Sequence, residues 1–339
     1  MEAYYYQQMS KPRQAAYHAM KNGFDAISPV ITIPLLEINA ISDIFFQLRL
    51  DCPELFYLKT FVCRYHPGAK HMDLVPEYLF EKSKIREHQA ALTSRIIKLV
   101  REAQNLNETE KLRFIHDFIC RNVRYDKLKK PYSHEIIGPL GQGVGVCEGI
   151  AKTVKILCDK LGIWCMIAIS DAVPEHGIKL RHAWNVVKIN GQYFHLDATF
   201  DNTLGQGDEV RYDYFLLDDS HQFRDHQHLL YPVPTCTVGD QCYYRVNKLS
   251  FTKIEDVCKR AQMSIRKGLP FVFHWRGGAL TQAVIKDLLE ALEAEAQKKD
   301  RHAALSFNRW QAVVHVTFPK ELPTEVSHEE EANEGEQYE

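Results

Sequence analysis

The sequence predicts an α+β fold, in which helices and an antiparallel sheet follow one another along the chain. Several segments longer than ten residues repeat apolar side chains at helical spacing. After the helical pattern at residues 148–161, three short runs of apolar or alternating residues predict strands. The last two runs flank Asn190-Gly191, a dipeptide that favours a tight antiparallel hairpin because both residues tolerate positive φ. At 339 residues, the chain is long enough for more than one domain.

The amino-terminal part is expected to hold three helices and a strand. Apolar stripes at three- and four-residue steps predict the helices, and alternation predicts the strand, at residues 11–24, 37–50, 83–105 and 55–65 respectively. Asp51-Cys52-Pro53 ends the second helix. We interpret residues 1–106 as an amino-terminal α+β subdomain.

The clearest helix signal lies at residues 107–122. Asn107 or Thr109 can cap this helix, and the two glutamates beside them suit its positive end. A loop rich in glycine and proline follows, and then a helix that Gly162 ends. The expected loop, helix and three strands occupy residues 126–146, 148–161, 163–169, 183–189 and 193–197.

After Tyr231-Pro232, the sequence again shows helical and strand patterns. Helices are expected at 253–267 and 281–298, and strands at 271–275 and 313–318. The last residues are acidic and almost free of apolar side chains, which predicts disorder. The expected organisation is therefore an amino-terminal subdomain, a core, a small α/β subdomain and a disordered tail, at residues 1–106, 107–231, 232–323 and 324–339.

Composition narrows the class of protein. Basic and acidic residues number 42 and 44, so the chain lacks the excess positive charge expected for binding nucleic acid or an anionic membrane. The amino terminus carries no secretory signal pattern and no run of about 18 apolar residues occurs, which argues against a membrane span. The nine cysteines lack the regular spacing of a disulfide scaffold. We therefore expect a reduced, cytoplasmic protein.

Cys147 is the best candidate nucleophile. Three glycines among residues 141–145 precede it, and a predicted helix follows at once. At the start of a helix, unpaired backbone N–H groups and the helix dipole favour the thiolate, which is the reactive form of cysteine. The same N–H groups can bind the oxyanion of a tetrahedral intermediate.

His182 and Asp197 are the candidate base and orienting acid. With the turn at Asn190-Gly191, paired residues on the two strands have numbers that sum to about 381. That register brings His182 near the extension of the partner strand, at residues 197–201. A carboxylate there can hold the imidazole beside the thiolate. Asp201 competes with Asp197 for this role.

Three ordered blocks of residues resemble the transglutaminase-like superfamily, most closely its bacterial branch of cysteine peptidases. They are Gly-Val-Cys-Glu-Gly at 145–149, His-Ala-Trp-Asn at 182–185 and His-Leu-Asp-Ala-Thr-Phe-Asp at 195–201. Residues 122–126 and Asp225-His226 also fit the pattern. The resemblance covers about residues 107–230. The family usually has a tryptophan before the last aspartate of the third block, where this chain has Phe200.

The resemblance implies a papain-like core, in which a helix bearing the nucleophile packs on an antiparallel sheet. It places Cys147, His182 and Asp197 on the nucleophile, the base and the orienting acid. Gln142 is a weaker candidate, as a side-chain donor to the oxyanion. His195 and Trp184 either line the cleft or pack in the core. No cofactor is implied. His226, His228, Cys236 and Cys242 match no common zinc spacing.

Three functions remain open. The favoured one is a cysteine peptidase or amidase, in which water releases a thioester formed on Cys147 from a peptide or protein substrate. In a transglutaminase, an amine would intercept the same thioester. A binding module that has kept the fold without the chemistry is the third. The sequence does not identify the substrate or the oligomeric state.

Overall fold

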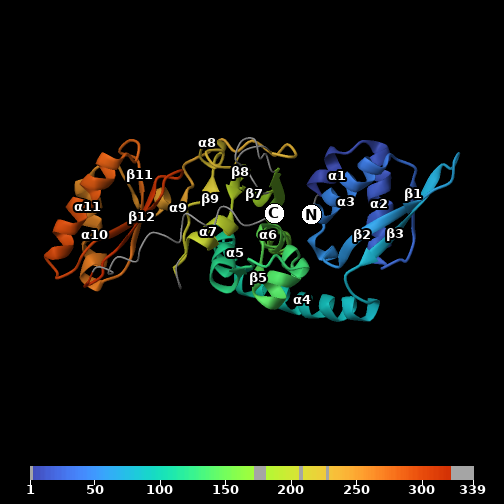
Figure 1. The fold of residues 1–339 in the computed structure, drawn as a ribbon, viewed down its shortest axis with the longest axis horizontal. Helices are drawn as coiled ribbons and strands as arrows, with labels where there is room; N and C mark the ends of the chain where they lie inside the picture. Colours follow the sequence, from blue (N-terminus) through green and yellow to red (C-terminus); the bar gives the residue numbers. More distant parts are fainter. Residues whose placement is uncertain (1–2, 172–180, 206–208, 227–228, 322–339) are drawn as a thin grey trace. The chain divides into compact units, whose positions relative to one another are not determined.

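The computed structural model describes residues 3–171, 181–205, 209–226 and 229–321. It divides into two compact units, Met1–Cys242 and Tyr243–Glu339 (Figure 1). Helices and largely antiparallel sheets occur in both, so the α+β class is confirmed. None of the described helices is long and apolar enough to cross a lipid bilayer. The expected acidic tail, residues 324–339, lies outside the described residues.

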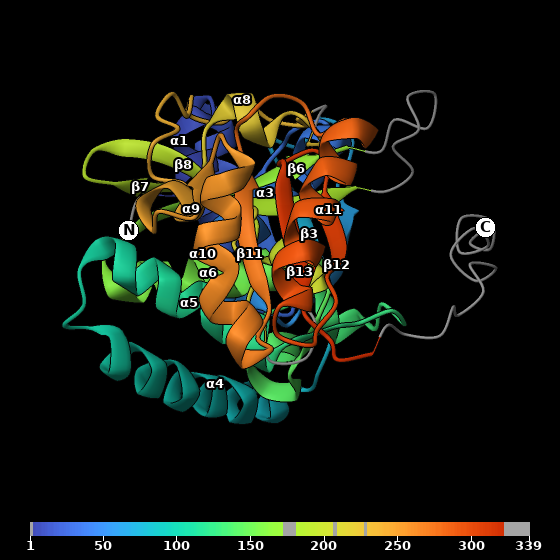
Figure 2. The ribbon, with the colours of Figure 1, turned by 90° about the vertical axis from the view of Figure 1, so that its left-hand side faces the viewer.

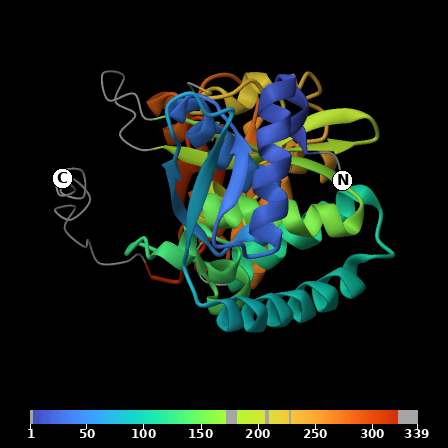
Figure 3. The same cartoon turned by 90° about the vertical axis from the view of Figure 1, so that its right-hand side faces the viewer.

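The first part of unit 1 packs helices on a small antiparallel sheet of order β1-β3-β2. Its elements are α1 (Tyr4–Gln8), α2 (Lys11–Asp25), β1 (Ile31–Pro34), α3 (Ile38–Asp51), the 3₁₀ turn η1 (Pro53–Leu55), β2 (Leu58–Arg64) and β3 (His71–Tyr78). Figure 3 shows α2 beside this sheet. The sequence predicted α2, α3 and β2 closely. It missed β1, which has four residues, and β3, which contains a proline that argues against a strand.

Two helices lead into the core: α4 (Lys82–Ala103) and α5 (Glu108–Asn122). Asn107 caps α5, because its side chain accepts a hydrogen bond from the Glu110 N–H at 2.9 Å. The Glu110 carboxylate in turn accepts from the Asn107 N–H at 3.2 Å. This reciprocal pair is a capping box, and it fixes where the helix begins. Of the two caps that the sequence allowed, the structure uses Asn107.

The glycine-rich loop is more ordered than the sequence suggested. It contains β4 (Arg124–Tyr125), the 3₁₀ turn η2 (Pro131–His134), the π-helical turn η3 (Gly138–Gln142) and β5 (Val144–Gly145), and it leads into α6 (Cys147–Leu161). Strand β4 pairs in parallel with β5. Gly143 adopts φ 66°, which favours glycine. At Gly149, an added Cβ would lie 2.2 Å from the carbonyl oxygen of Ser133, so only glycine lets the loop approach α6 this closely.

An antiparallel sheet of order β6-β7-β8-β9 packs against α6. Its strands are β6 (Trp164–Ser170), β7 (His182–Ile189), β8 (Gln192–Leu196) and β9 (Phe215–Leu217). Asn190 and Gly191 have φ of 48° and 81°, and Ile189 pairs with Gln192 in the predicted register. The short helices α7 (Ala198–Leu204) and α8 (Asp219–Gln222) follow β8 and β9. The expected packing of the helix that carries Cys147 on an antiparallel sheet is present.

Unit 2 is a smaller α/β structure with a sheet of order β10-β11-β13-β12. Its elements are α9 (Tyr243–Val246), β10 (Ser250–Phe251), α10 (Ile254–Lys267), β11 (Phe271–Trp275), α11 (Gln282–Gln297), β12 (Ala304–Asn308) and β13 (Val313–Thr317). The two long helices pack on each other and bury Val257, Leu288 and Phe273 in one core (Figure 2). The sequence missed β10 and β12. The four-part division at residues 106, 231 and 323 stays a proposal.

Candidate active site

Cys147 is the first residue of α6. Val146 precedes it with φ −97° and ψ 174° and provides no side-chain cap. The N–H groups of the first helical turn therefore have no acceptor within the helix, and they lie at its positive end beside the sulfur. The Cys147 side chain is partly buried and packs against the core of the four-stranded sheet. The glycine-rich approach had predicted this position at a helix start.

His182 begins β7 and faces Asp197. Its Nε2 is 2.6 Å from Asp197 Oδ2, and 18% of its side chain is exposed. Burial alone would lower the pKa of His182, but the charge and hydrogen bond of Asp197 and a hydrogen bond with Cys147 raise it to about 10. Because Nε2 faces Asp197, Nδ1 is the ring nitrogen left for the sulfur. His182 is thus held as an imidazolium next to Cys147.

Asp197 is completely buried and uses its two oxygens differently. It follows β8 directly and caps α7, since Oδ1 accepts hydrogen bonds from the N–H groups of Thr199 at 2.8 Å and Phe200 at 3.0 Å. Oδ2 faces His182. Burial would raise the pKa of Asp197, but the nearby imidazolium of His182 and the hydrogen bonds hold it well below its usual range. The carboxylate therefore stays ionised.

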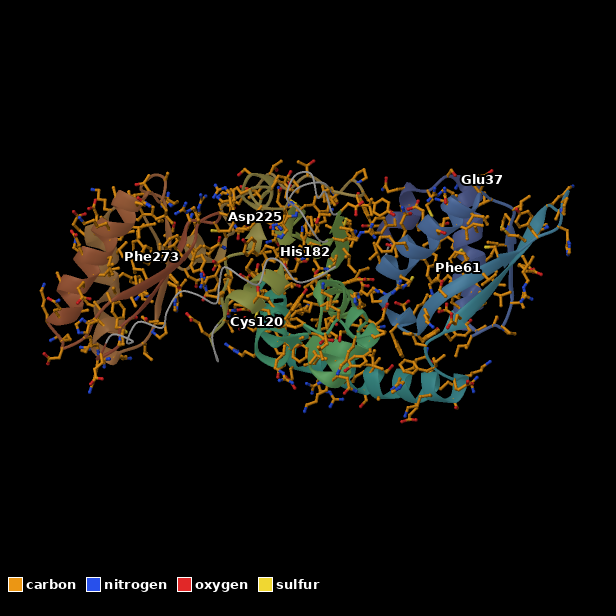
Figure 4. All side chains as sticks on the ribbon, viewed as in Figure 1. Glu37, Phe61, Cys120, His182, Asp225 and Phe273 are labelled. Carbon is orange, nitrogen blue, oxygen red and sulfur yellow. The ribbon has the colours of Figure 1, made fainter. Side chains whose placement is uncertain are left out.

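A second histidine, His226, contacts the same oxygen of Asp197. Its Nε2 lies 2.8 Å from Asp197 Oδ2, and its Nδ1 lies 2.7 Å from Asp225 Oδ1. His226 is 3% exposed. Figure 4 labels His182 and Asp225 in this part of unit 1. Asp225-His226 fits the family pattern, but the sequence indicated no catalytic role for it, because nothing in the local sequence connects it to Asp197.

Tyr125 also lies near the sulfur. It is on β4, paired with Gly145 two residues before Cys147. Burial, followed by the negative charge of Cys147, raises the pKa of Tyr125 to about 12, so its hydroxyl keeps its proton. Tyr125 is 37% exposed.

Gln142 ends the π-helical turn before β5, and its side chain is exposed. Its suggested role as an oxyanion donor stays a prediction. Asp201, the competing acid, is not beside His182. Its Oδ2 instead lies 2.9 Å from Nε2 of His116, and it accepts a hydrogen bond from the Tyr214 N–H. The carboxylate that meets His182 is Asp197.

Trp184 and His195 are both buried. The indole of Trp184 stacks on the ring of His182 with an interplanar angle of 18°. Its Nε1–H donates to Nδ1 of His195 at 3.0 Å. Nε2 of His195 lies 2.9 Å from Asp219 Oδ1. Trp184 and His195 thus pack in the core, and Trp184 holds the plane of the His182 ring.

Of the four residues that match no common zinc spacing, the three that the structure describes do not form one group. His226 belongs to the Asp197 cluster, Cys242 packs against Tyr214, and His228 lies outside the described residues. Cys236 instead lies near His195 and Asp219. That trio does not suit a metal ion. Because Nδ1 of His195 accepts a hydrogen bond from Trp184, Nε2 carries the ring proton toward Asp219 and has no lone pair to offer.

A buried ionic cluster anchors the start of α6. Nζ of the fully buried Lys152 lies 2.7 Å from a carboxylate oxygen of Glu135 and 2.7 Å from one of Glu148. Arg49 of α3 also pairs with Glu135. Burial would raise the pKa of Glu148, but the charge of Lys152 holds it well below its usual range. The cluster ties α3, the loop and the first turn of α6 together next to Cys147. The sequence analysis missed it.

A match to a known family covers the same region. Residues 97–198 match the model of the transglutaminase-like superfamily, and this span includes Cys147, His182 and Asp197. No curated protein matches the chain.

Three solved structures are similar in part. A transglutaminase has 11% identity and a TM-score of 0.30, with 52% of each chain aligned. A putative cysteine protease from Cytophaga hutchinsonii has 15% identity and a TM-score of 0.28, over 42% of this chain and 62% of that one. A putative protease from Parabacteroides distasonis has 15% identity and a TM-score of 0.26, over 42% and 36%. The chain therefore spans about half the length of the first structure and less than two thirds of the other two.

Proposed function

We propose that this protein, whose residues 97–198 belong to the transglutaminase-like superfamily, is a cysteine-dependent amide hydrolase acting on a peptide or protein. One observation carries the proposal. Cys147 begins a helix and lies close enough to His182 to raise its pKa, and His182 lies 2.6 Å from the buried carboxylate of Asp197. A thiolate, an imidazolium and an orienting acid in this order are the groups needed for acyl transfer from an amide.

Each group has a step in the proposed reaction. The Cys147 thiolate attacks the amide carbonyl carbon, and N–H groups at the start of α6 stabilise the resulting oxyanion. The imidazolium of His182 gives its proton to the leaving amine as the C–N bond breaks, which leaves a thioester on Cys147. Neutral His182 then takes a proton from water, and the hydroxide attacks the thioester. The acid departs, and the thiolate–imidazolium pair is restored.

A glutamine-containing peptide offered together with a labelled amine tests this proposal. A hydrolase releases ammonia or peptide fragments and leaves the amine unincorporated. Cys147→Ala should abolish turnover with almost no change in melting temperature, because the site is at the edge of the core. Cys120→Ala is the matched control and should retain turnover. Incorporation of the label would contradict hydrolysis and would indicate acyl transfer to amines instead.

Alkylation tests the chemistry without a known substrate. Iodoacetamide at mildly acidic pH should modify Cys147 faster than the other eight cysteines, because only a stabilised thiolate persists there. Peptide mass spectrometry gives the rate for each cysteine. If Cys147 reacts no faster than the rest, the protein is a binding module and the proposed enzyme is wrong.

A further inference from the structure

Asp197 Oδ2 is shared by two imidazoles. His182 Nε2 lies 2.6 Å from this oxygen and His226 Nε2 lies 2.8 Å from it. Thiol, imidazole and carboxylate suffice for the proposed reaction, so the second histidine requires its own explanation. It comes from the segment after α8, 29 residues beyond Asp197 in the chain, and it lies in the same buried cluster.

Both ring nitrogens of His226 face carboxylate oxygens. Nε2 meets Asp197, Nδ1 meets Asp225, and the Tyr214 hydroxyl donates to the other oxygen of Asp225. An ionised carboxylate only accepts hydrogen bonds, so each nitrogen must carry a proton and the ring must be an imidazolium. Burial would lower the pKa of His226, but Asp197 and Asp225 raise it, in agreement with this geometry.

The surroundings keep His226 away from a substrate. It is 3% exposed, and the rings of Trp184, Phe200 and Tyr214 lie 5.0, 4.6 and 5.4 Å from its centroid. The ring of His182, which begins β7, lies 5.3 Å from the ring of His226. His226 can therefore act on the reaction without touching a substrate, through its hydrogen bond to Asp197 and through its charge beside His182.

We propose that His226 is a positioning residue that holds Asp197 Oδ2 toward His182 and thereby sets the reactivity of Cys147. This inference rests on the proposed function of Cys147. The carboxylate of Asp197 is fixed at three points: two N–H groups of α7 bind Oδ1, and His226 binds Oδ2. Without the third point, Oδ2 has one partner fewer to oppose rotation away from His182.

Two substitutions separate the bond to Asp197 from the rest of the side chain. In His226→Gln, the amide nitrogen takes the place of Nε2 and can still donate to Asp197. In His226→Asn, the shorter amide takes the place of Nδ1 and can reach only Asp225. We expect Cys147 in His226→Asn to be alkylated about 10- to 100-fold more slowly than in the wild type, which is the effect of losing a hydrogen bond to a charged group. His226→Gln should retain most of the rate.

The pH profile of alkylation gives a second readout. Both amides remove a buried cation that repels the imidazolium of His182. Loss of the cation alone would move the upper inflection of the rate, where His182 loses its proton, to higher pH in both variants. Because His226→Asn also frees Asp197 to turn away from His182, its inflection should lie at lower pH than that of His226→Gln. The other groups that face these two histidines, Asp197, Asp225, Tyr214 and Trp184, are unchanged. A merely structural role would lower the melting temperature and give the two variants the same inflection.

His116→Gln is the matched control. His116 is also completely buried and lies 2.9 Å from a carboxylate, but that carboxylate is Asp201. This variant should be less thermally stable than the wild type, while the rate and pH profile of Cys147 alkylation should not change. If wild-type Cys147 reacts quickly and His226→Asn matches it in rate and profile, the inference on His226 is wrong and the proposed function stands. If wild-type Cys147 is itself unreactive, the proposed function fails first.

Discussion

Among the described residues of unit 1, cysteine, histidine and aspartate come close together at more than one place, and two of these trios place the cysteine on a long helix. Only one of the two has the features of an active site. The first trio is Cys147, His182 and Asp197. In the second, His116 Nε2 lies 2.9 Å from Asp201 Oδ2 and 3.7 Å from the sulfur of Cys120. Figure 4 labels His182 in the first trio and Cys120 in the second.

The two trios differ in where the sulfur sits on its helix. Cys147 begins α6, where free N–H groups and the positive end of the dipole favour a thiolate. Cys120 lies two residues before the end of α5, at the negative end. His182 is partly exposed, whereas His116 is completely buried. Residue types alone therefore do not make a catalytic site. The helix terminus and access to solvent decide which trio can act.

The largest expected effect comes from replacing Asp197, and replacing Asp201 is the comparison. Asp197→Asn keeps an oxygen for the N–H groups of α7 but turns an NH₂ group toward His182, so the imidazolium loses its counter-charge. Turnover should fall about 10³- to 10⁴-fold, as it does when the acid of a comparable triad becomes an amide. Asp201→Asn should leave turnover nearly intact and lower the melting temperature. Similar losses of turnover in both variants would remove the distinction between the trios.

The two cysteines should differ next in reactivity. At pH 6 an ordinary thiol is less than about 1% ionised, whereas a thiolate paired with an imidazolium is largely formed. Cys147 should therefore be alkylated about 100-fold faster than Cys120, after allowing for the weaker nucleophilicity of a more acidic thiol. Competition between the two sites in one sample, followed by mass spectrometry, measures the ratio directly. A ratio near one would contradict the role given to the helix start.

The pairing of His182 with Asp197 should also make folding stability depend on pH. The pKa of Asp197 is lowered on folding, so its contribution is present above about pH 4 and is lost as the pH falls further. The pKa of His182 is raised to about 10, so its contribution is complete below about pH 6.5 and is lost as the pH rises toward 10. Urea unfolding should therefore show the largest difference between wild type and His182→Gln from about pH 4 to 6.5. A difference that grows toward pH 10 would show that folding lowers, rather than raises, the pKa of His182.

The smallest effect is expected for Cys120→Ala. The thiol is partly buried and its contacts with His116 are 3.7 Å and longer, so its removal should change the free energy of unfolding by about 1 kcal/mol or less. The alkylation rate of Cys147 should not change. Loss of that reactivity in Cys120→Ala would show that the second trio takes part in the chemistry after all.

The features that the sequence predicted well are those set by local chain chemistry. Gly162 ends α6, and Asn190-Gly191 fixes the pairing of β7 with β8 and hence the approach of His182 to Asp197. The position of Cys147 at a helix start follows from the glycines before it. In each case the residues that determine the structure are near one another in the sequence.

The features that were missed depend on contacts between distant segments. His226 reaches Asp197 across 29 residues, and Arg49 reaches Glu135 across 86. Lys152 lies on a helix whose apolar pattern gives no sign that its amine is buried between two carboxylates. A buried charge of this kind is stable only because its partners arrive from elsewhere in the fold. Periodicity along one segment cannot reveal it.

The double use of Asp197 explains why an aspartate, rather than a glutamate, occupies this position. One oxygen starts α7 while the other, on the same carbon, meets the two imidazoles. An additional methylene would carry the carboxylate past one of these targets, so a longer acid could satisfy the helix or the histidines but not both. Because the start of α7 fixes Oδ1, it also sets the distance between the negative charge of Asp197 and the ring of His182.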